Sequence, residues 1–345
     1  MIFDEVVRLG KDKTERSKNT IQTYRYDWKR AIKLFHPKKK KIDVNDTENL
    51  KILDLPINEI VEKSSKLDLK KQKRIINIII VLITARINPR KRKREENTLY
   101  TPPNKKRRIE PTKTKLDKLR QVLKDINLKI MDDEAKNEKT EKQKTNWISI
   151  EQYDRLVSRL NTEVKEILKW ERTDKKSRDK FQQFVILKFY RIHHLRADLG
   201  DLRVITNKQF NALSKSEQKK QNYLVLDKRA RYIILNDYKT KKQYKQIKIQ
   251  LRKEIAKLMK KLIKMHDSQY LLVNQKGTRL TKTTFSTYFR RFMKKLTGKS
   301  VGVSLLRHIF ISEKTKNMKT VSERKALAQS MLHSVNQQML YNKID

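Results

Sequence analysis

The positive charge of this chain constrains its fold and its partners more than any other feature of the sequence. Lysine and arginine number 86 among 345 residues, against 39 aspartates and glutamates, so the formal net charge is +47. A compact protein with this excess repels itself strongly unless a polyanion binds it. Double-stranded DNA is therefore the first partner to consider. The length favours two domains, because single cores stop growing at about 250–300 residues.

The composition excludes several kinds of chemistry. The chain has no cysteine, six histidines and five glycines, so it lacks disulfides, thiolate metal sites, a thiol nucleophile and glycine-repeat phosphate loops. The longest apolar run, 75–83, is interrupted by Asn77 and is shorter than the roughly 20 residues that cross a bilayer. We expect a soluble protein with no membrane segment, no cofactor or metal, and no small-molecule substrate.

The first part of the chain is predicted to be helical. Apolar residues recur at helical spacing after Asn19, which we expect to be the N-cap, and an isoleucine-rich helix is predicted between residues 68 and 87. Residues 89–115 contain eleven basic residues and four prolines, a composition typical of a linker. We therefore predict a helical domain over 1–88 and a basic linker with a connecting helix over 89–145. A second domain over 146–345 completes the chain.

The second domain is predicted to be mainly α with a small antiparallel sheet, an α+β fold. Ser149 is a plausible cap for the first helix, and Thr320 with Glu323 forms a capping box for a later one. The helices are expected at about 150–170, 178–192, 253–265, 284–296, from 304 and after 320. The strands are expected at 202–205, 223–226, 232–235 and 244–251.

Candidate catalytic residues follow one another along this second domain. Cleavage of a DNA backbone without metal needs arginines for the phosphate, a nucleophile and a proton donor for the leaving oxygen. Without cysteine, serine or tyrosine remains as the nucleophile. The candidates are Arg196 in LRAD, Lys239 in the hairpin segment YKTKK, Arg307 in SLLRH, His333 in MLHS, and Tyr341 eight residues further on.

This ordered set resembles the tyrosine recombinase (phage-integrase-like) family and, more distantly, the type IB topoisomerases. The resemblance covers most of 146–345 and is strongest in LLRH, in LHS followed by a tyrosine, and in the YKT hairpin. The segment NTIQTYRYDWKRAIK also looks like the opening helix of the family's core-binding domain. The variant pattern is similar to integrases of large DNA viruses and virophages.

The resemblance implies a mechanism and a setting. Tyr341 would attack the scissile phosphate to form a 3′-phosphotyrosyl bond, while Arg196 and Arg307 would bind the non-bridging oxygens. Lys239 would protonate the leaving 5′-oxygen, and His333 would contact the phosphate or assist proton transfer. The expected function is site-specific recombination that integrates or excises a viral or mobile element. The expected assembly is a homo-oligomer, dimer or tetramer, on DNA in the host nucleus or a viral factory, with residues 1–88 and 146–345 gripping opposite faces of the duplex.

Two positions depart from the family pattern, and two other functions stay open. Ser304 stands where the family usually has His or Lys, and Asp198 is our candidate for the acidic partner of the arginines. His308 is expected to pack or orient, and the pair at 193–194 to mark a helix end without metal. A type IB topoisomerase-like enzyme would share the chemistry, and a non-catalytic basic DNA-binding protein would need only the charge.

Overall fold

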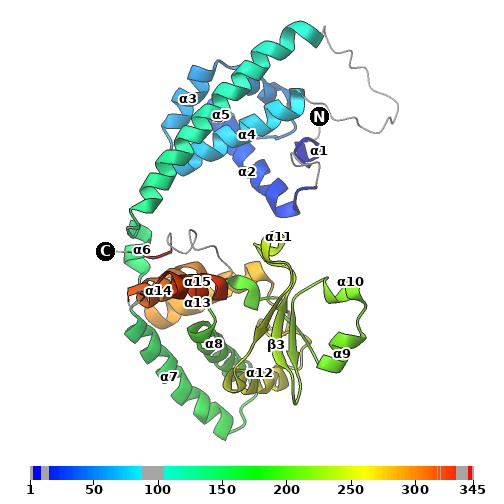
Figure 1. Cartoon of the computed structure of the whole chain (residues 1–345), viewed down its shortest axis with the longest axis vertical. Helices are drawn as coiled ribbons and strands as arrows, with labels where there is room; N and C mark the ends of the chain where they lie inside the picture. The colour runs from blue at the N-terminus through cyan, green and yellow to red at the C-terminus, as the bar shows by residue number, and fades with distance from the viewer. Residues whose placement is uncertain are drawn as a thin grey trace. The chain divides into compact units, whose positions relative to one another are not determined.

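The computed structural model describes residues 3–8, 15–87, 105–316, 318, 320–331 and 341–343. The chain forms two compact units, Met1–Lys136 and Asn137–Asp345 (Figure 1). The predicted class, mainly α with a small sheet, is confirmed. None of the described helices combines the length and the apolarity that crossing a bilayer requires.

The first unit is a helical bundle around the isoleucine-rich helix. Trp28 and Ile32 of one helix pack with Ile75 and Ile79 of another in a single buried cluster, as their helical spacing predicts. The elements are α1 (Phe3–Val7), α2 (Lys18–Phe35), the 3-10 helix η1 (Thr47–Asp54), α3 (Ile57–Ser65), α4 (Leu69–Ile87) and α5 (Lys105–Ala135).

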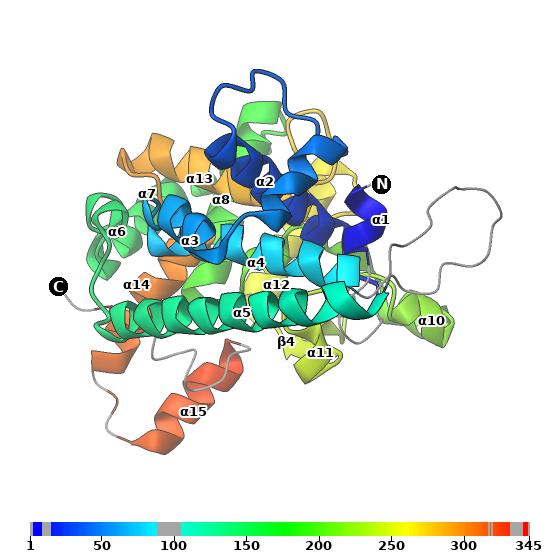
Figure 2. The ribbon, with the colours of Figure 1, turned by 90° about the horizontal axis from the view of Figure 1, so that it is seen from above.

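Two details of this unit differ from the prediction. The N-cap of α2 is Ser17, whose hydroxyl accepts a hydrogen bond from the amide of Thr20 at 3.2 Å, so the prediction of Asn19 was two residues late. Helix α5 begins at Lys105, inside the predicted linker, and runs beside α4 (Figure 2). Its Leu119 and Ile126 enter the core of the first unit, so burial of this face stabilises a segment that its charge alone would leave unfolded. The basic run at 90–94 lies outside the described residues.

The second unit contains a large helical core and the sheet. The predicted cap at Ser149 and the predicted capping box at Thr320 are both present, and Ser149 also forms a capping box with Gln152. Helix α8, rich in buried aromatic residues, packs against both α7 and α12. The helices are α6 (Glu141–Asn146), α7 (Ile150–Lys169), α8 (Lys175–Ile192), η2 (Ala197–Leu199), α9 (Asn207–Ala212), α10 (Lys215–Gln218), α11 (Lys241–Tyr244), α12 (Lys253–His266), α13 (Lys282–Thr297), α14 (Val303–Lys316) and α15 (Val321–Ser330).

The sheet has the order β1-β2-β3-β4 and is mixed rather than wholly antiparallel. Its strands are β1 (Arg203–Ile205), β2 (Tyr223–Leu226), β3 (Arg231–Leu235) and β4 (Ile247–Gln250). The β2–β3 and β3–β4 pairs are antiparallel, but β1 is parallel to β2. Helices α9 and α10 lie between β1 and β2 in the chain, and such a crossover lets the second strand run in the direction of the first. Helix α11 includes Tyr244, the first residue of the predicted strand 244–251, so β4 begins only at Ile247.

Candidate active site

Helix α14 carries a buried arginine among apolar side chains. Arg307 is 1% exposed, and its neighbours Leu306 and Ile309 belong to the main core. One Nη of its guanidinium donates to the carbonyl oxygen of Met331 at 3.1 Å. Burial lowers the pKa of Arg307 to about 10, so the group still carries its charge at neutral pH. Because burying a guanidinium is costly, its position indicates a specific role rather than a contribution to solubility.

Tyr341 lies against this arginine. The guanidinium carbon of Arg307 is 5.3 Å from the centroid of the Tyr341 ring. The imidazole of His308 also lies against the ring, at 4.3 Å between centroids and 19° between planes. The predicted nucleophile and the predicted second arginine therefore meet within one chain.

The segment 341–343 is held along one face of α14. Its partners on that helix are spaced by four and then three residues, a spacing that places side chains on one side of a helix. Hydrogen bonds run from His308 Nδ1 to Tyr341 O (3.1 Å), from Lys343 N to Ser312 Oγ (2.8 Å) and from Thr315 Oγ1 to Asn342 Oδ1 (2.8 Å). The Ser312 hydroxyl also donates to Tyr341 O at 3.5 Å.

The contact with Tyr341 defines the tautomer of His308. A backbone carbonyl can only accept, so the Nδ1 of His308 carries the proton in the hydrogen bond to Tyr341 O. Burial lowers the pKa of His308 to about 4, so the ring is neutral near pH 7 and its Nε2 has a free lone pair. His308 therefore orients Tyr341 through stacking and one hydrogen bond, as the sequence led us to expect of it.

Arg196 enters the site on the short helix η2. It is the N-cap of η2, and the hydroxyl of Tyr190 donates to its carbonyl oxygen at 2.8 Å. The turn packs tightly on α13, because a Cβ at Gly200 would come within 2.8 Å of the Phe285 Cβ. The positive charge of Arg196 helps to lower the pKa of Arg307, which places the two arginines in one electrostatic environment.

Asp198 is the buried acid of this region. Burial raises its pKa, while the charges of Lys282, Arg196 and Arg307 oppose that rise. The carboxylate thus interacts electrostatically with both predicted catalytic arginines, and its role as their acidic partner stays a prediction. Lys282, at the start of α13, forms an ion pair with Asp198, at 3.9 Å between Nζ and Oδ1.

Lys239 occupies the β3–β4 connection. The connection is longer than a tight hairpin and contains α11, and the Lys239 side chain is exposed. Asp237, two residues earlier, forms an ion pair with Lys282 at 2.7 Å. Lys282 therefore links the connection that carries Lys239 to the turn that carries Arg196. Sequence reasoning missed both Lys282 and Asp237, since neither residue stands in a recognisable motif.

The remaining candidates are placed as follows. His333 lies outside the described residues. Ser304 is exposed in the first turn of α14, which begins at Val303, so the serine is not its cap. His193 ends α8, and His194 is buried against Phe310 with its Nδ1 donating to Tyr190 O at 2.9 Å. These contacts give the histidine pair a structural role.

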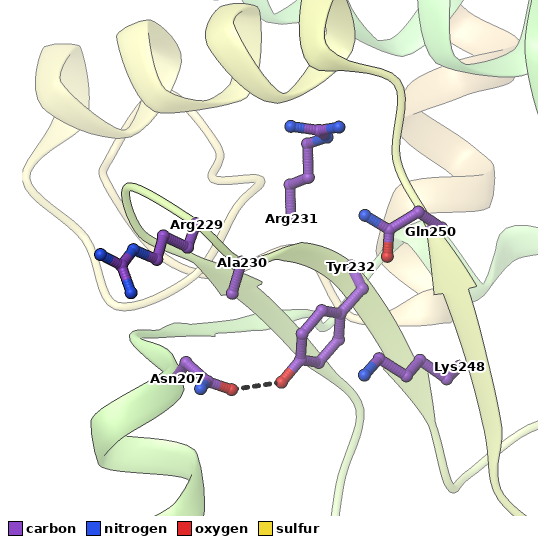
Figure 3. Close-up of a pocket in the computed structure, with 7 residues that line it drawn as sticks. All are labelled: Asn207, Arg229, Ala230, Arg231, Tyr232, Lys248 and Gln250. Atoms are coloured by element: carbon purple, nitrogen blue, oxygen red, sulfur yellow. Dashed lines mark hydrogen bonds between the residues drawn. The ribbon is translucent and has the colours of Figure 1, made fainter.

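A separate basic pocket lies where β3 begins and β4 ends (Figure 3). It measures about 340 Å³ and contains none of the predicted catalytic residues. The ammonium of Lys248 lies 3.9 Å from the centre of the Tyr232 ring, and the Tyr232 hydroxyl donates to Asn207 Oδ1 at 2.6 Å. Arg229 and Arg231 add two further cations, and no carboxylate is among the described lining residues. The Asp227 carboxylate nearby accepts from the amides of Asn207, Arg229 and Ala230. This lining suits an anion such as a phosphate.

Comparison with known proteins gives a distant structural likeness. No family model matches the chain, and no curated protein matches it. Among solved structures, the crystal structure of XerA recombinase aligns with a TM-score of 0.37 and 16% sequence identity, over 96% of this chain and 88% of that one. Similarity at this level does not identify an activity.

Proposed function

We propose that this protein is a site-specific DNA recombinase that cuts and rejoins double-stranded DNA through a 3′-phosphotyrosyl intermediate. The observation that carries the proposal is the position of Tyr341 beside the buried, charged Arg307. A protein that only coats DNA has no need of an arginine buried against a tyrosine ring. An enzyme that stabilises a phosphorane-like transition state has that need, because preorganised charge acts most strongly where water is excluded.

In the proposed reaction the Tyr341 hydroxyl gives up its proton to solvent, and its oxygen attacks the scissile phosphorus. A tyrosyl–phosphate bond forms at the 3′ side as the bond to the 5′-oxygen breaks, and Lys239 gives that oxygen its proton. Arg196 and Arg307 bind the non-bridging oxygens and stabilise their added charge. Rejoining reverses these steps with a second 5′-hydroxyl as the nucleophile, so the phosphate ester bond energy is retained and no nucleotide is consumed. His333 remains a candidate for assisting proton transfer.

The large positive charge of the chain supports binding to the DNA backbone through many phosphate contacts. Pairing of two sites would require two or four copies on DNA, and the element moved would be viral or mobile. A topoisomerase would perform the same cleavage as a monomer and relax supercoils without a second site.

Covalent trapping tests the proposal. The protein is incubated in EDTA with labelled DNA that is nicked just 3′ of candidate scissile phosphates, including the termini of the element that encodes it, and is then run on a denaturing gel. We expect a labelled adduct of protein size that disappears in Tyr341→Phe. Tyr26→Phe is the control, since Tyr26 is 59% exposed on the first unit.

The outcome also separates the alternatives. An adduct accompanied by relaxation of supercoiled plasmid without strand exchange would favour the topoisomerase. Absence of an adduct on the element's own termini would leave a non-catalytic DNA-binding protein as the better description.

A further inference from the structure

We propose that Lys282 is a positioning residue for Lys239. It ties the β3–β4 connection to the η2 turn, and this tie places the ammonium of Lys239 where the leaving 5′-oxygen must be protonated. The inference rests on the proposed function, because it assigns a task to Lys239 in DNA cleavage.

Lys282 lies between two carboxylates from different elements. Its ammonium is 2.7 Å from Asp237 Oδ2 in the β3–β4 connection and 3.9 Å from Asp198 Oδ1 in η2. It also donates to the carbonyl oxygen of Asp237. The hydrogen bond from Lys282 is the main cause of the lowered pKa of Asp237. One lysine therefore holds both the side chain and the backbone of Asp237.

Further contacts hold the backbone on either side of this tie. The Asn222 side chain accepts from the amide of Asp237 at 2.8 Å and donates to its carbonyl at 2.9 Å. Tyr238 is buried, and its hydroxyl donates to the carbonyl of Lys245 at 2.7 Å. The backbone leading into Lys239 is thus positioned by contacts from its own connection, from the residue that precedes β2, and from α13.

The side chain of Lys239 stays available in this arrangement. It is exposed, and among the described residues no ion pair is formed by it, whereas Asp237 is already engaged by Lys282 and by Lys241 at 3.2 Å. Removal of Lys282 would leave Asp237 with its shortest ion pair broken, two residues from Lys239. The carboxylate would then compete with DNA for the Lys239 ammonium, and the connection would lose its link to η2.

The chemistry of the leaving group offers a readout specific to Lys239. An alkoxide leaving group needs a proton, whereas a thiolate, whose conjugate acid has a pKa of about 8.5, leaves without one. A DNA substrate with sulfur in place of the bridging 5′-oxygen therefore bypasses the proton donor. It does not bypass the arginines or the nucleophile.

The experiment compares adduct formation on matched oxygen and sulfur substrates for full-length variants. General acid catalysis contributes about 10²–10⁴-fold, so we expect Lys239→Met to lose about 100-fold on oxygen and Lys282→Met about 10-fold. Both should recover to near the wild-type rate on sulfur. Lys282→Arg should retain most of the oxygen rate. Lys276→Met, an exposed lysine with the same change of charge, should behave as wild type on both substrates.

Asp237→Asn removes the other partner of the Lys282–Asp237 ion pair with little change of shape. It should show the same recovery of rate on the sulfur substrate, so the test does not depend on the folding of Lys282→Met alone. The inference would be overturned if Lys282→Met and Asp237→Asn were equally slow on the oxygen and sulfur substrates. It would also be overturned if both variants were fully active on the oxygen substrate. A Lys239→Met defect that sulfur does not restore would also overturn it. In each of these cases the proposed function still stands if the wild-type protein forms the adduct. If the wild-type protein forms no adduct, the proposed function itself is rejected.

Discussion

The ring of Tyr341 stacks on the imidazole of His308, with their centroids 4.3 Å apart, and the same imidazole donates from Nδ1 to the Tyr341 carbonyl oxygen at 3.1 Å. One side chain thus contacts both the ring and the backbone of the proposed nucleophile. Stacking limits the tilt of the ring, and the hydrogen bond limits the position of the Cα. His308 therefore restricts the orientations from which Tyr341 could approach a phosphate.

His308→Ala should slow adduct formation by about 30-fold. Stacking and a hydrogen bond together contribute about 2 kcal/mol, which corresponds to about 30-fold in rate when they hold the reactive geometry. DNA affinity should stay within about twofold, because the neutral ring adds no charge. Quench-flow assays with gel-shift titrations measure both. His36→Ala, an exposed histidine of the first unit, serves as control, and equal loss of affinity and rate would reject the orienting role.

Arg307→Ala should reduce adduct formation by about 10²–10³-fold, the loss typical of removing one preorganised donor. Arg307→Lys should restore little, since an ammonium cannot bind two phosphate oxygens in a fork. DNA affinity should change little because the rest of the positive surface remains. Arg291→Ala on the exposed side of α13 is the matched control. A parallel fall of binding and cleavage would make Arg307 an affinity residue instead.

Gly200→Ala should destabilise the second unit and slow cleavage. The added Cβ would lie 2.8 Å from the Phe285 Cβ and 3.0 Å from the Thr281 carbonyl oxygen, so η2 must shift and carry Arg196 with it. Overpacking of this kind costs about 1–3 kcal/mol. Thermal unfolding and adduct assays measure the two effects. Gly302→Ala, whose added Cβ would meet the Arg290 Nε at 3.9 Å, should leave both unchanged.

Stability should fall as the pH is lowered below neutrality. Burial lowers the pKa of His194 to about 3, whereas the unfolded value is about 6.5. The unfolded state therefore binds more protons between these values, and the free energy of unfolding decreases as the pH falls through 6.5. For His194 the loss is about 2 kcal/mol between pH 7 and pH 5. Denaturant titrations at both pH values should show a smaller difference for His194→Gln, and an unchanged difference would contradict the assignment.

Arg229→Ala in the basic pocket should weaken DNA binding and reduce the slope of log affinity against log salt by about one. The double variant with Lys248→Ala should reduce it by about two. Fluorescence anisotropy across a salt series measures the slope. Lys165→Ala, which removes one exposed charge from α7, is the comparison. If Lys165→Ala changes the slope as much as Arg229→Ala does, the pocket does not bind a specific phosphate.

Local patterns predicted much of the fold. β2 begins and ends at the predicted residues, and the predicted cap at Ser149 and capping box at Thr320 are present. Such features depend on neighbours within a few residues, so the sequence contains all the information they need. The parallel pairing of β1 with β2 depends instead on how α9 and α10 pack, and the start of α5 depends on the core it covers. Neither choice is visible in a local pattern.

For the candidate site, the sequence determined which residue types are present and in what order, because the family-like order of Arg196, Lys239, Arg307 and Tyr341 can be read along the chain. The tertiary structure decided which of them meet. Arg307 lies beside Tyr341 because 341–343 is held along α14, and Lys282 reaches Asp198 and Asp237 because the start of α13 lies close to both. Contacts between residues far apart in the chain arise only when separate elements pack around one core.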